Sequence, residues 1–304
     1  MHADEVETDA GLVRRLLSAQ FPQWSGLRVE RVPSFGTDNA LYRLGDDMVV
    51  RLPRIDWAAS DIDKDARWLD QLRPLVPVAI PQQLATGTPG LGFPWRWGIY
   101  RWLEGANPVV GAIDRPEELA RDVGRFVAAL RRVRLSDTRT GSRAGPLAAR
   151  DPGVRQAIRD VAGELDATAV TAAWETALRA PAWGAPPVWT HGDLLRGNLL
   201  LREGRLAAVI DWSLLGVGDP ACDAIVAWSV LPRETRDVFR AEGGFDDATW
   251  ARGRGWALCC GLLQVPYYAE SNPELADNGR HMVVEILAEA NIRSYHPGSI
   301  ANLL

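Results

Sequence analysis

Residues 189–201 read WTHGDLLRGNLLL and residues 206–212 read LAAVIDW, and these two stretches decide how the chain is interpreted. Their apolar runs are typical of short strands. Glu203 and Gly204 lie between them and predict a tight turn, so the second run returns beside the first. Asp193, Asn198 and Asp211 interrupt the apolar pattern. Asp and Asn are depleted in strands, and their presence at these positions therefore needs a reason.

Phosphoryl transfer supplies such a reason. Its loose transition state requires positioning and charge neutralisation, with a carboxylate to accept the proton of the attacking hydroxyl and hard oxygen ligands for Mg²⁺. One loop can bring Asp193 and Asn198 to a single site, and the hairpin returns Asp211 to it. We therefore predict Asp193 as the base and Asn198 and Asp211 as metal ligands. The alternative is that all three form ordinary Asx turns.

The first hundred residues predict a small β-rich lobe. Strand candidates separated by turns occupy residues 27–32, 41–44, 48–52, 83–86 and 95–103. Residues 61–72 place Ile62, Ala66, Leu69 and Leu72 at helical spacing, and Pro74 ends that helix. Residues 1–103 are thus interpreted as an N-terminal lobe with one main helix; nucleotide binding by this lobe is implied only by the family resemblance given below.

The rest of the chain has a different character. Residues 104–108 (EGANP) read as a linker, and amphipathic helices are predicted over 116–132 and 170–179. Residues 132–153 are rich in Arg, Ser, Gly and Pro and are predicted to form a mobile loop. We expect residues 104–304 to form a larger, mostly helical lobe, which makes the fold class α+β and bilobal.

The composition excludes several classes of function. A net charge of −5 argues against a nucleic-acid partner, and no run of about 18 apolar residues predicts a membrane span. The N-terminus is acidic rather than signal-like, so we expect a cytoplasmic protein. Three cysteines and four scattered histidines indicate neither a disulfide framework nor structural zinc.

The motif HGDxxxGN at residues 191–198, followed by Ile210-Asp211-Trp212, resembles the aminoglycoside phosphotransferase family, which includes macrolide kinases and is related to the protein kinases. The resemblance runs from about Val32 to the C-terminus. It implies a protein-kinase-like bilobal fold, ATP or GTP with Mg²⁺ as cofactors, and Asp193 as the base of the catalytic loop. The family usually has proline where this chain has Arg196.

The resemblance also implies nucleotide contacts in the small lobe. Ser34, Gly36 and Thr37 belong to the loop that would cover the phosphates. Arg51 stands where protein kinases place a phosphate-binding lysine, and its partner acid would be Asp65. Lys64, the only lysine, is predicted on the helix and so cannot replace Arg51.

Further residues follow from the same alignment. Tyr100 would line the back of the base pocket, while the backbones of Arg101 and Leu103 would hold the base. Asp219 and Asp223 are interpreted chiefly as supports of the catalytic loop, with substrate contact by Asp223 as the alternative. Candidate acceptor contacts that would suit a cationic substrate are Asp223, Tyr267, Glu270 and Glu274.

The sequence leaves several alternatives open. The expected function is phosphorylation of a hydroxyl on a small molecule, an antibiotic of the aminoglycoside or macrolide type. A housekeeping kinase for choline, another amino alcohol or a sugar shares the same motifs. A non-catalytic nucleotide-binding module is a further alternative because of Arg51. Both a monomer and a homodimer are compatible with the sequence.

Overall fold

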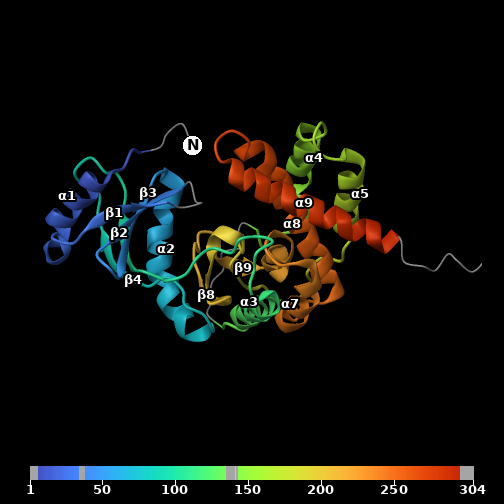
Figure 1. Cartoon of the computed structure of the whole chain (residues 1–304), viewed down its shortest axis with the longest axis horizontal. Helices are drawn as coiled ribbons and strands as arrows, with labels where there is room; N and C mark the ends of the chain where they lie inside the picture. The colour runs from blue at the N-terminus through green and yellow to red at the C-terminus, as the bar shows by residue number, and fades with distance from the viewer. Residues whose placement is uncertain (1–5, 34–37, 135–140, 142, 295–304) are drawn as a thin grey trace, which may run out of the picture.

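The computed structural model describes residues 6–33, 38–134, 141 and 143–294, and it shows two lobes (Figure 1). The N-terminal lobe holds an antiparallel five-stranded sheet of order β1-β2-β3-β5-β4. The strands are β1 (Val29–Val32), β2 (Asn39–Leu44), β3 (Met48–Pro53), β4 (Gln83–Gly87) and β5 (Trp97–Arg101). The predicted β-rich lobe is confirmed, with strand ends shifted by a few residues.

A helix that we did not predict, α1 (Ala10–Gln20), lies on one side of this sheet, and α2 lies on the other (Figure 1). Asp9 caps α1 by accepting a hydrogen bond from the Leu12 N–H at 2.6 Å. Leu12, Val13, Leu16 and Leu17 are buried against the sheet residues of the small-lobe core. Their one-sided spacing is the sequence signal that could have revealed the helix.

Helix α2 (Asp56–Leu72) begins before the predicted helix and connects the two lobes. Its C-terminal half carries Trp68 and Leu69 into the core of the large lobe, where the ring centroids of Trp68 and Trp189 are 5.0 Å apart. Its N-terminal half faces β3 through Asp61 and Asp65. The position of α2 therefore couples the small-lobe sheet to the large lobe.

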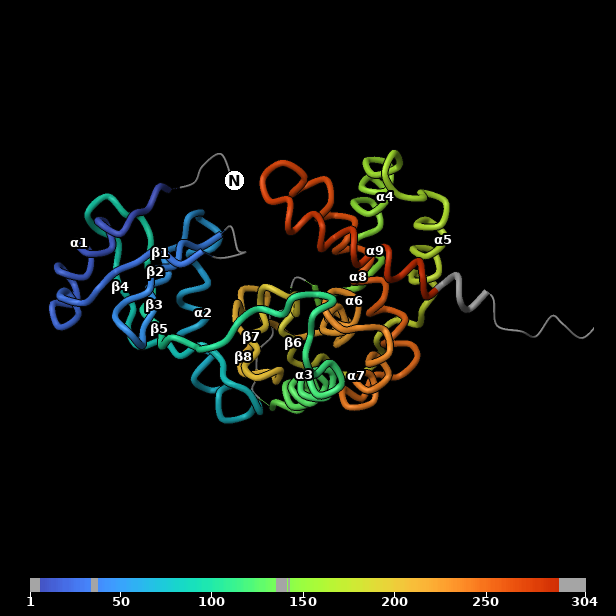
Figure 2. Tube along the Cα trace, viewed as in Figure 1, coloured from blue at the N-terminus to red at the C-terminus, as the bar shows by residue number. Residues whose placement is uncertain are grey.

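Two segments of the chain cross between the lobes (Figure 2), and each forms a short backbone pairing with the large lobe. Ala106, after β5, exchanges backbone hydrogen bonds with Leu201 at 2.9 and 2.8 Å. Ala79, before β4, accepts a hydrogen bond from the Val209 N–H at 3.0 Å. Both pairings reach the hairpin formed by β7 (Leu199–Arg202) and β8 (Arg205–Val209), so the connection is anchored beside the segments that carry the sequence motif.

The C-terminal lobe is mostly helical, as predicted. Its helices are α3 (Pro116–Arg131), α4 (Asp151–Asp160), α5 (Ala167–Leu178), α6 (Val226–Ser229), α7 (Arg236–Gly243), α8 (Asp247–Tyr268) and α9 (Pro273–Ser294). Two small sheets complete it: β6 (Val188–Thr190) with β9 (Gly216–Gly218), and β7 (Leu199–Arg202) with β8 (Arg205–Val209). None of the described helices is both long and apolar enough to cross a membrane.

The prediction of a mobile loop over residues 132–153 is wrong in its second half. A 3₁₀ helix occupies Leu147–Arg150, and α4 begins at Asp151. The composition hid this helix start because Pro152 and Gly153, usually turn residues, occupy the first turn of α4, where proline is tolerated. Residues 135–140 and 142 lie outside the described part of the chain.

A close crossing of α8 and α9 generates a stability prediction. A Cβ atom added at Gly261 would lie 2.8 Å from the Gly279 carbonyl oxygen, whereas one added at Gly153 in α4 meets nothing within 4 Å. We expect Gly261→Ala to lower the free energy of unfolding by about 1–3 kcal/mol, because the helices must separate.

The matched variant Gly153→Ala should raise the unfolding free energy by about 0.5 kcal/mol, since alanine restricts the unfolded chain. Urea unfolding followed by circular dichroism measures both changes. Equal stability of the two variants would contradict the close α8–α9 packing.

Candidate active site

The loop after β6 is held in place by one buried carboxylate. Asp223, in the 3₁₀ helix Pro220–Ile225, accepts hydrogen bonds from the backbone N–H groups of His191 (3.0 Å) and Gly192 (2.7 Å). Its side chain is fully buried. Burial raises the pKa of Asp223 to about 6, although the two N–H donors act in the opposite direction. These contacts favour the supporting role for Asp223 and leave no surface for an acceptor.

His191 links this loop to the β8 end of the hairpin. Its Nδ1 accepts a hydrogen bond from the Asp193 N–H at 3.2 Å, so the proton lies on Nε2, which donates to the Ile210 carbonyl at 3.1 Å. The ring packs edge-on against Trp212 with centroids 4.8 Å apart. Burial lowers the pKa of His191, which favours the neutral ring that this arrangement needs. His191 therefore braces the loop.

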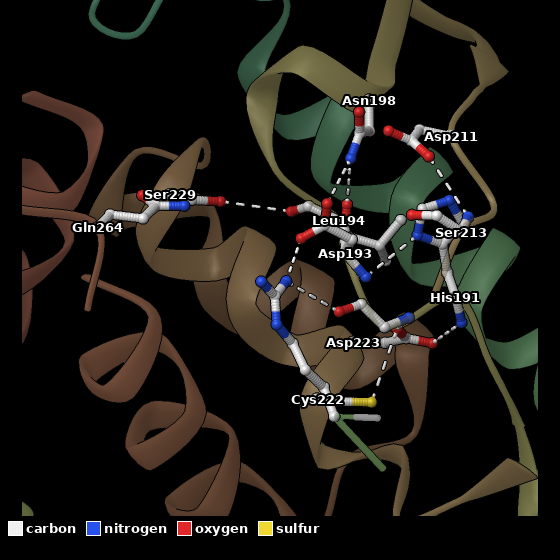
Figure 3. A network of polar contacts seen from close by, with 12 residues as sticks. His191, Asp193, Leu194, Asn198, Asp211, Ser213, Cys222, Asp223, Ser229 and Gln264 are labelled. Atoms are coloured by element: carbon white, nitrogen blue, oxygen red, sulfur yellow. Dashed lines mark hydrogen bonds and ion pairs between the residues drawn. The ribbon is translucent and has the colours of Figure 1, made fainter. Parts of the chain in front are cut away.

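Asp193, Asn198 and Asp211 come together at one place (Figure 3). The Asn198 Nδ2 donates to the Asp193 carboxylate Oδ2 at 2.9 Å and to the Asp193 carbonyl at 2.8 Å. The Ile210 N–H donates to the Asn198 carbonyl at 2.9 Å, which brings Asp211 beside Asn198. Asp211 has φ of +58°, a left-handed conformation that Asp tolerates better than most residues.

The oxygens of Asn198 and Asp211 fit a Mg²⁺ ion. The Asn198 amide nitrogen is engaged by Asp193, so its oxygen is the atom left for a ligand, and Figure 3 shows the Asp211 carboxylate beside the Asn198 side chain. Within the described residues no group of three His, Cys, Asp or Glu side chains could hold a metal alone. Mg²⁺ typically takes one or two protein oxygens and completes its shell with phosphates and water.

A cation that sequence analysis missed also contacts Asp193. The Arg143 Nη1 forms an ion pair with Asp193 Oδ1 and donates to the Gly192 carbonyl at 3.2 Å. The side chains of Arg143 and Asp193 are 25 % and 17 % exposed, so the pair is largely shielded from water. No sequence signal marked Arg143, because it lies in the segment interpreted as a mobile loop.

A cavity of about 330 Å³ lies between the lobes. Asn198 and Asp211 line it on one side, and Leu103 lines it where the linker begins. Further apolar lining comes from Leu41, Val49, Leu200 and Ile210. The cavity therefore combines apolar walls suited to a flat base with oxygen groups suited to a metal–phosphate complex.

Arg51 and Asp65 meet at the small-lobe side of this cavity. The Arg51 Nη1 lies 2.7 Å from Asp65 Oδ2, and the Tyr100 hydroxyl donates to the same oxygen at 3.0 Å. Asp61 adds a second carboxylate 3.6 Å from Arg51. Burial raises the pKa of Asp65 to about 6, with Arg51 acting against that shift. Both Arg51 and Tyr100 line the cavity.

Two further residues fasten the loops around the site. Lys64, on α2 as predicted, pairs with Asp61 at 2.7 Å and donates to the carbonyl of Ser213, two residues after Asp211. Asn107, in the linker, donates through one nitrogen to the carbonyls of Gly197 and Leu199, each at 2.9 Å. Asn107 was missed, because a polar residue before proline in a linker is ordinary turn chemistry.

Comparison with known proteins identifies the family. The model of the APH phosphotransferase enzyme family matches residues 29–256, which include the whole constellation described above. The chain belongs to this family. It is a phosphotransferase, and the resemblance inferred from the HGDxxxGN motif is confirmed. No curated protein matches the chain.

Solved structures of this family share the fold. The GDP and kanamycin complex of APH(2″)-IIIa is 20 % identical, with a TM-score of 0.72 over 91 % of this chain and 99 % of that one. The apoenzyme of macrolide 2′-phosphotransferase MphH from Brachybacterium faecium is 24 % identical, with a TM-score of 0.59 over 91 % and 97 % of the two chains. The predicted bilobal kinase-like fold is confirmed.

The other acceptor candidates, Tyr267, Glu270 and Glu274, do not line the cavity. They lie around the turn between α8 and α9, which Figure 2 shows on the side of the large lobe nearer the N-terminal lobe. Tyr267 is 59 % exposed at the end of α8, and Glu270 is exposed in the turn. Glu274 forms an ion pair with Arg196 at 3.2 Å, which ties α9 to the catalytic loop at the position where the family usually has proline. Their roles in acceptor binding stay predictions.

Five further residues were predicted to contact the nucleotide: Ser34, Gly36, Thr37, Arg101 and Leu103. Ser34, Gly36 and Thr37 fall outside the described residues. Arg101 and Leu103 both line the cavity, and the Arg101 N–H donates to the Gln82 carbonyl at 2.9 Å.

The buried carboxylate of Asp223 generates a pH prediction. Its folded pKa of about 6 lies above its ordinary value of 3.8, so the folded state favours the protonated form. The contribution of Asp223 to stability therefore falls as the pH rises from about 4 to about 6. The side chain of the Asp223→Asn variant cannot ionise, so the variant serves as the reference. We expect the difference in unfolding free energy, wild type minus variant, to fall between about pH 4 and pH 6 and to stay constant above that range.

Urea titrations of both proteins at a series of pH values measure this difference, in which the titration of Asp65 cancels. A difference independent of pH would show that Asp223 is not held as described.

Proposed function

We propose that this phosphotransferase moves the γ-phosphoryl group of ATP or GTP to a hydroxyl of an antibiotic of the aminoglycoside or macrolide type. The observation that carries the proposal is the joint placement of three side chains. Asn198 fixes the Asp193 carboxylate with its nitrogen at 2.9 Å, which leaves its oxygen for a ligand, and the Asp211 carboxylate lies beside it. A proton acceptor thus stands next to the ligands expected for a metal-bound triphosphate.

In this mechanism the acceptor hydroxyl hydrogen-bonds to the Asp193 carboxylate. Its oxygen forms a bond to the γ-phosphorus as the bond between that phosphorus and the β–γ bridging oxygen breaks, and its proton passes to Asp193. Asn198 and Asp211 would hold Mg²⁺, which neutralises charge on the phosphates. Arg51, kept in place by Asp65 at 2.7 Å, supplies a permanent cation for the phosphates at the other side of the cavity.

Structures with the same fold support the choice of ligands. They include a GDP complex with kanamycin, a ternary complex with streptomycin and ATP, and a macrolide 2′-phosphotransferase. The exposed Glu270 and the Glu274 carboxylate near the catalytic loop would suit ammonium groups on such an acceptor. The net charge of −5 is compatible with a cationic substrate.

A coupled assay of nucleoside diphosphate release tests the proposal directly. The assay contains Mg²⁺ with ATP or GTP and compares aminoglycosides, macrolides, choline, other amino alcohols and sugars. We expect turnover to depend on an antibiotic acceptor. Turnover with only an amino alcohol or sugar would instead identify a housekeeping kinase, and tight nucleotide binding without any turnover would identify a binding module.

Replacement of the base separates catalysis from binding. We expect Asp193→Asn to lower kcat by at least about 10²-fold, because general-base catalysis is lost, while nucleotide affinity stays unchanged. The matched control Asp70→Asn alters an exposed carboxylate that pairs with Arg73 on the surface, and it should leave both kcat and nucleotide affinity unchanged. Steady-state kinetics and calorimetric nucleotide titration measure both properties. Wild-type turnover by the Asp193→Asn variant would remove Asp193 as the base.

Arg51 gives a prediction on the nucleotide side. Arg51→Met should weaken nucleotide binding on the order of 10-fold to 100-fold, since a charge-assisted hydrogen bond contributes roughly 1.5–3 kcal/mol. Arg51→Lys retains the charge and should lose less. Titration with a non-hydrolysable nucleotide and Mg²⁺ measures the affinities. Unchanged affinity of the Met variant would mean that Arg51 only pairs with the acids of α2.

A further inference from the structure

Arg143 and Asn198 hold the two oxygens of the Asp193 carboxylate separately. The Arg143 guanidinium pairs with Oδ1, and the Asn198 amide donates to Oδ2 at 2.9 Å. The same Arg143 nitrogen donates to the Gly192 carbonyl at 3.2 Å. The carboxylate is therefore fixed by two residues from distant parts of the sequence, and Arg143 is the one for which the predicted reaction provides no role.

The backbone around Arg143 is attached to β9. The Gly141 N–H donates to the Val217 carbonyl at 3.1 Å, the Ala144 N–H to the Gly141 carbonyl at 2.9 Å, and the Asp219 N–H to the Ala144 carbonyl at 2.8 Å. These bonds already fix the turn. The Arg143 side chain is therefore not needed to hold its own backbone, and its contact with Asp193 calls for a separate reason.

The approach of this turn also requires a glycine opposite it. Gly218 has φ of +159°, and a Cβ atom there would lie 2.2 Å from the Ala144 carbonyl oxygen. The chain thus uses a residue without a side chain to let the turn come close enough for Arg143 to reach Asp193. Gly218 offers a way to move Arg143 without changing any charge.

We propose that Arg143 is a positioning residue for Asp193 in the transfer reaction, an inference that rests on the proposed function. Its guanidinium fixes the orientation of the carboxylate and keeps it from turning away from the acceptor hydroxyl. A carboxylate oxygen accepts two hydrogen bonds, so the hydroxyl can bind while Arg143 stays in place. Placement of the carboxylate matters here because phosphoryl transfer depends mainly on positioning and electrostatics.

Arg143→Ala tests this role once acceptor-dependent turnover of the wild type is established. We expect kcat to fall about 10²-fold, the loss typical of a displaced catalytic group, with nucleotide affinity unchanged. Arg143→Lys should recover part of kcat because it restores a cation. Guanidinium ion added to the Ala variant should raise its kcat, whereas urea, a neutral molecule of similar shape, should not.

Two further variants control for packing. Arg125→Ala removes an exposed arginine on α3 that pairs with Glu242 on α7, and it should leave kcat unchanged. Gly218→Ala should lower kcat through displacement of the Arg143 turn, and thermal unfolding shows whether that variant is folded.

The outcomes separate this inference from the proposed function. A wild type that phosphorylates no acceptor counts against the proposed function, and the inference falls with it. An active wild type whose Arg143→Ala variant keeps its kcat within about twofold overturns the positioning role alone. A fall in kcat that neither lysine nor guanidinium recovers also overturns it, because the effect would not depend on the cation.

Discussion

The buried carboxylate of Asp223 is the contact on which the catalytic loop depends. Its two oxygens accept the N–H groups of His191 and Gly192, which fixes the chain just before Asp193. An uncompensated carboxylate in this position would be costly, and the two donors reduce that cost. The loop cannot move away without leaving both the carboxylate and its own N–H groups unpaired in the core. A buried side chain thus decides where Asp193, the proposed base, stands.

The remaining parts of the site are joined to that loop by short local links. Asn198 reaches Asp193 through its amide, and the Ile210 N–H bonds the Asn198 carbonyl, so Asp211 follows. Helix α2 carries Asp65 toward Arg51 and, three residues later, packs Trp68 on Trp189. The small-lobe sheet and the loop after β6 are therefore joined through one helix.

Much of this could be predicted from the sequence because the informative residues are local. HGDxxxGN and the following Ile-Asp-Trp place three functional side chains within one loop and one hairpin. Helix α1 was missed, although its apolar residues recur at helical spacing. Arg143 and Asn107 could not be predicted, because their partners lie far away in the chain and neither belongs to a pattern. A contact between single polar residues that are far apart in the chain leaves no repeating pattern in the sequence from which it could be predicted.

Phosphorus NMR of the enzyme incubated with Mg²⁺, nucleoside triphosphate and an antibiotic acceptor tests the role of the site most directly. We predict a phosphate monoester on the acceptor that appears in step with the nucleoside diphosphate, because the proposed reaction joins the acceptor oxygen to the γ-phosphorus. Inorganic phosphate in place of the ester would show that water is the acceptor. That result would contradict the assignment of the site to phosphoryl transfer onto an antibiotic hydroxyl.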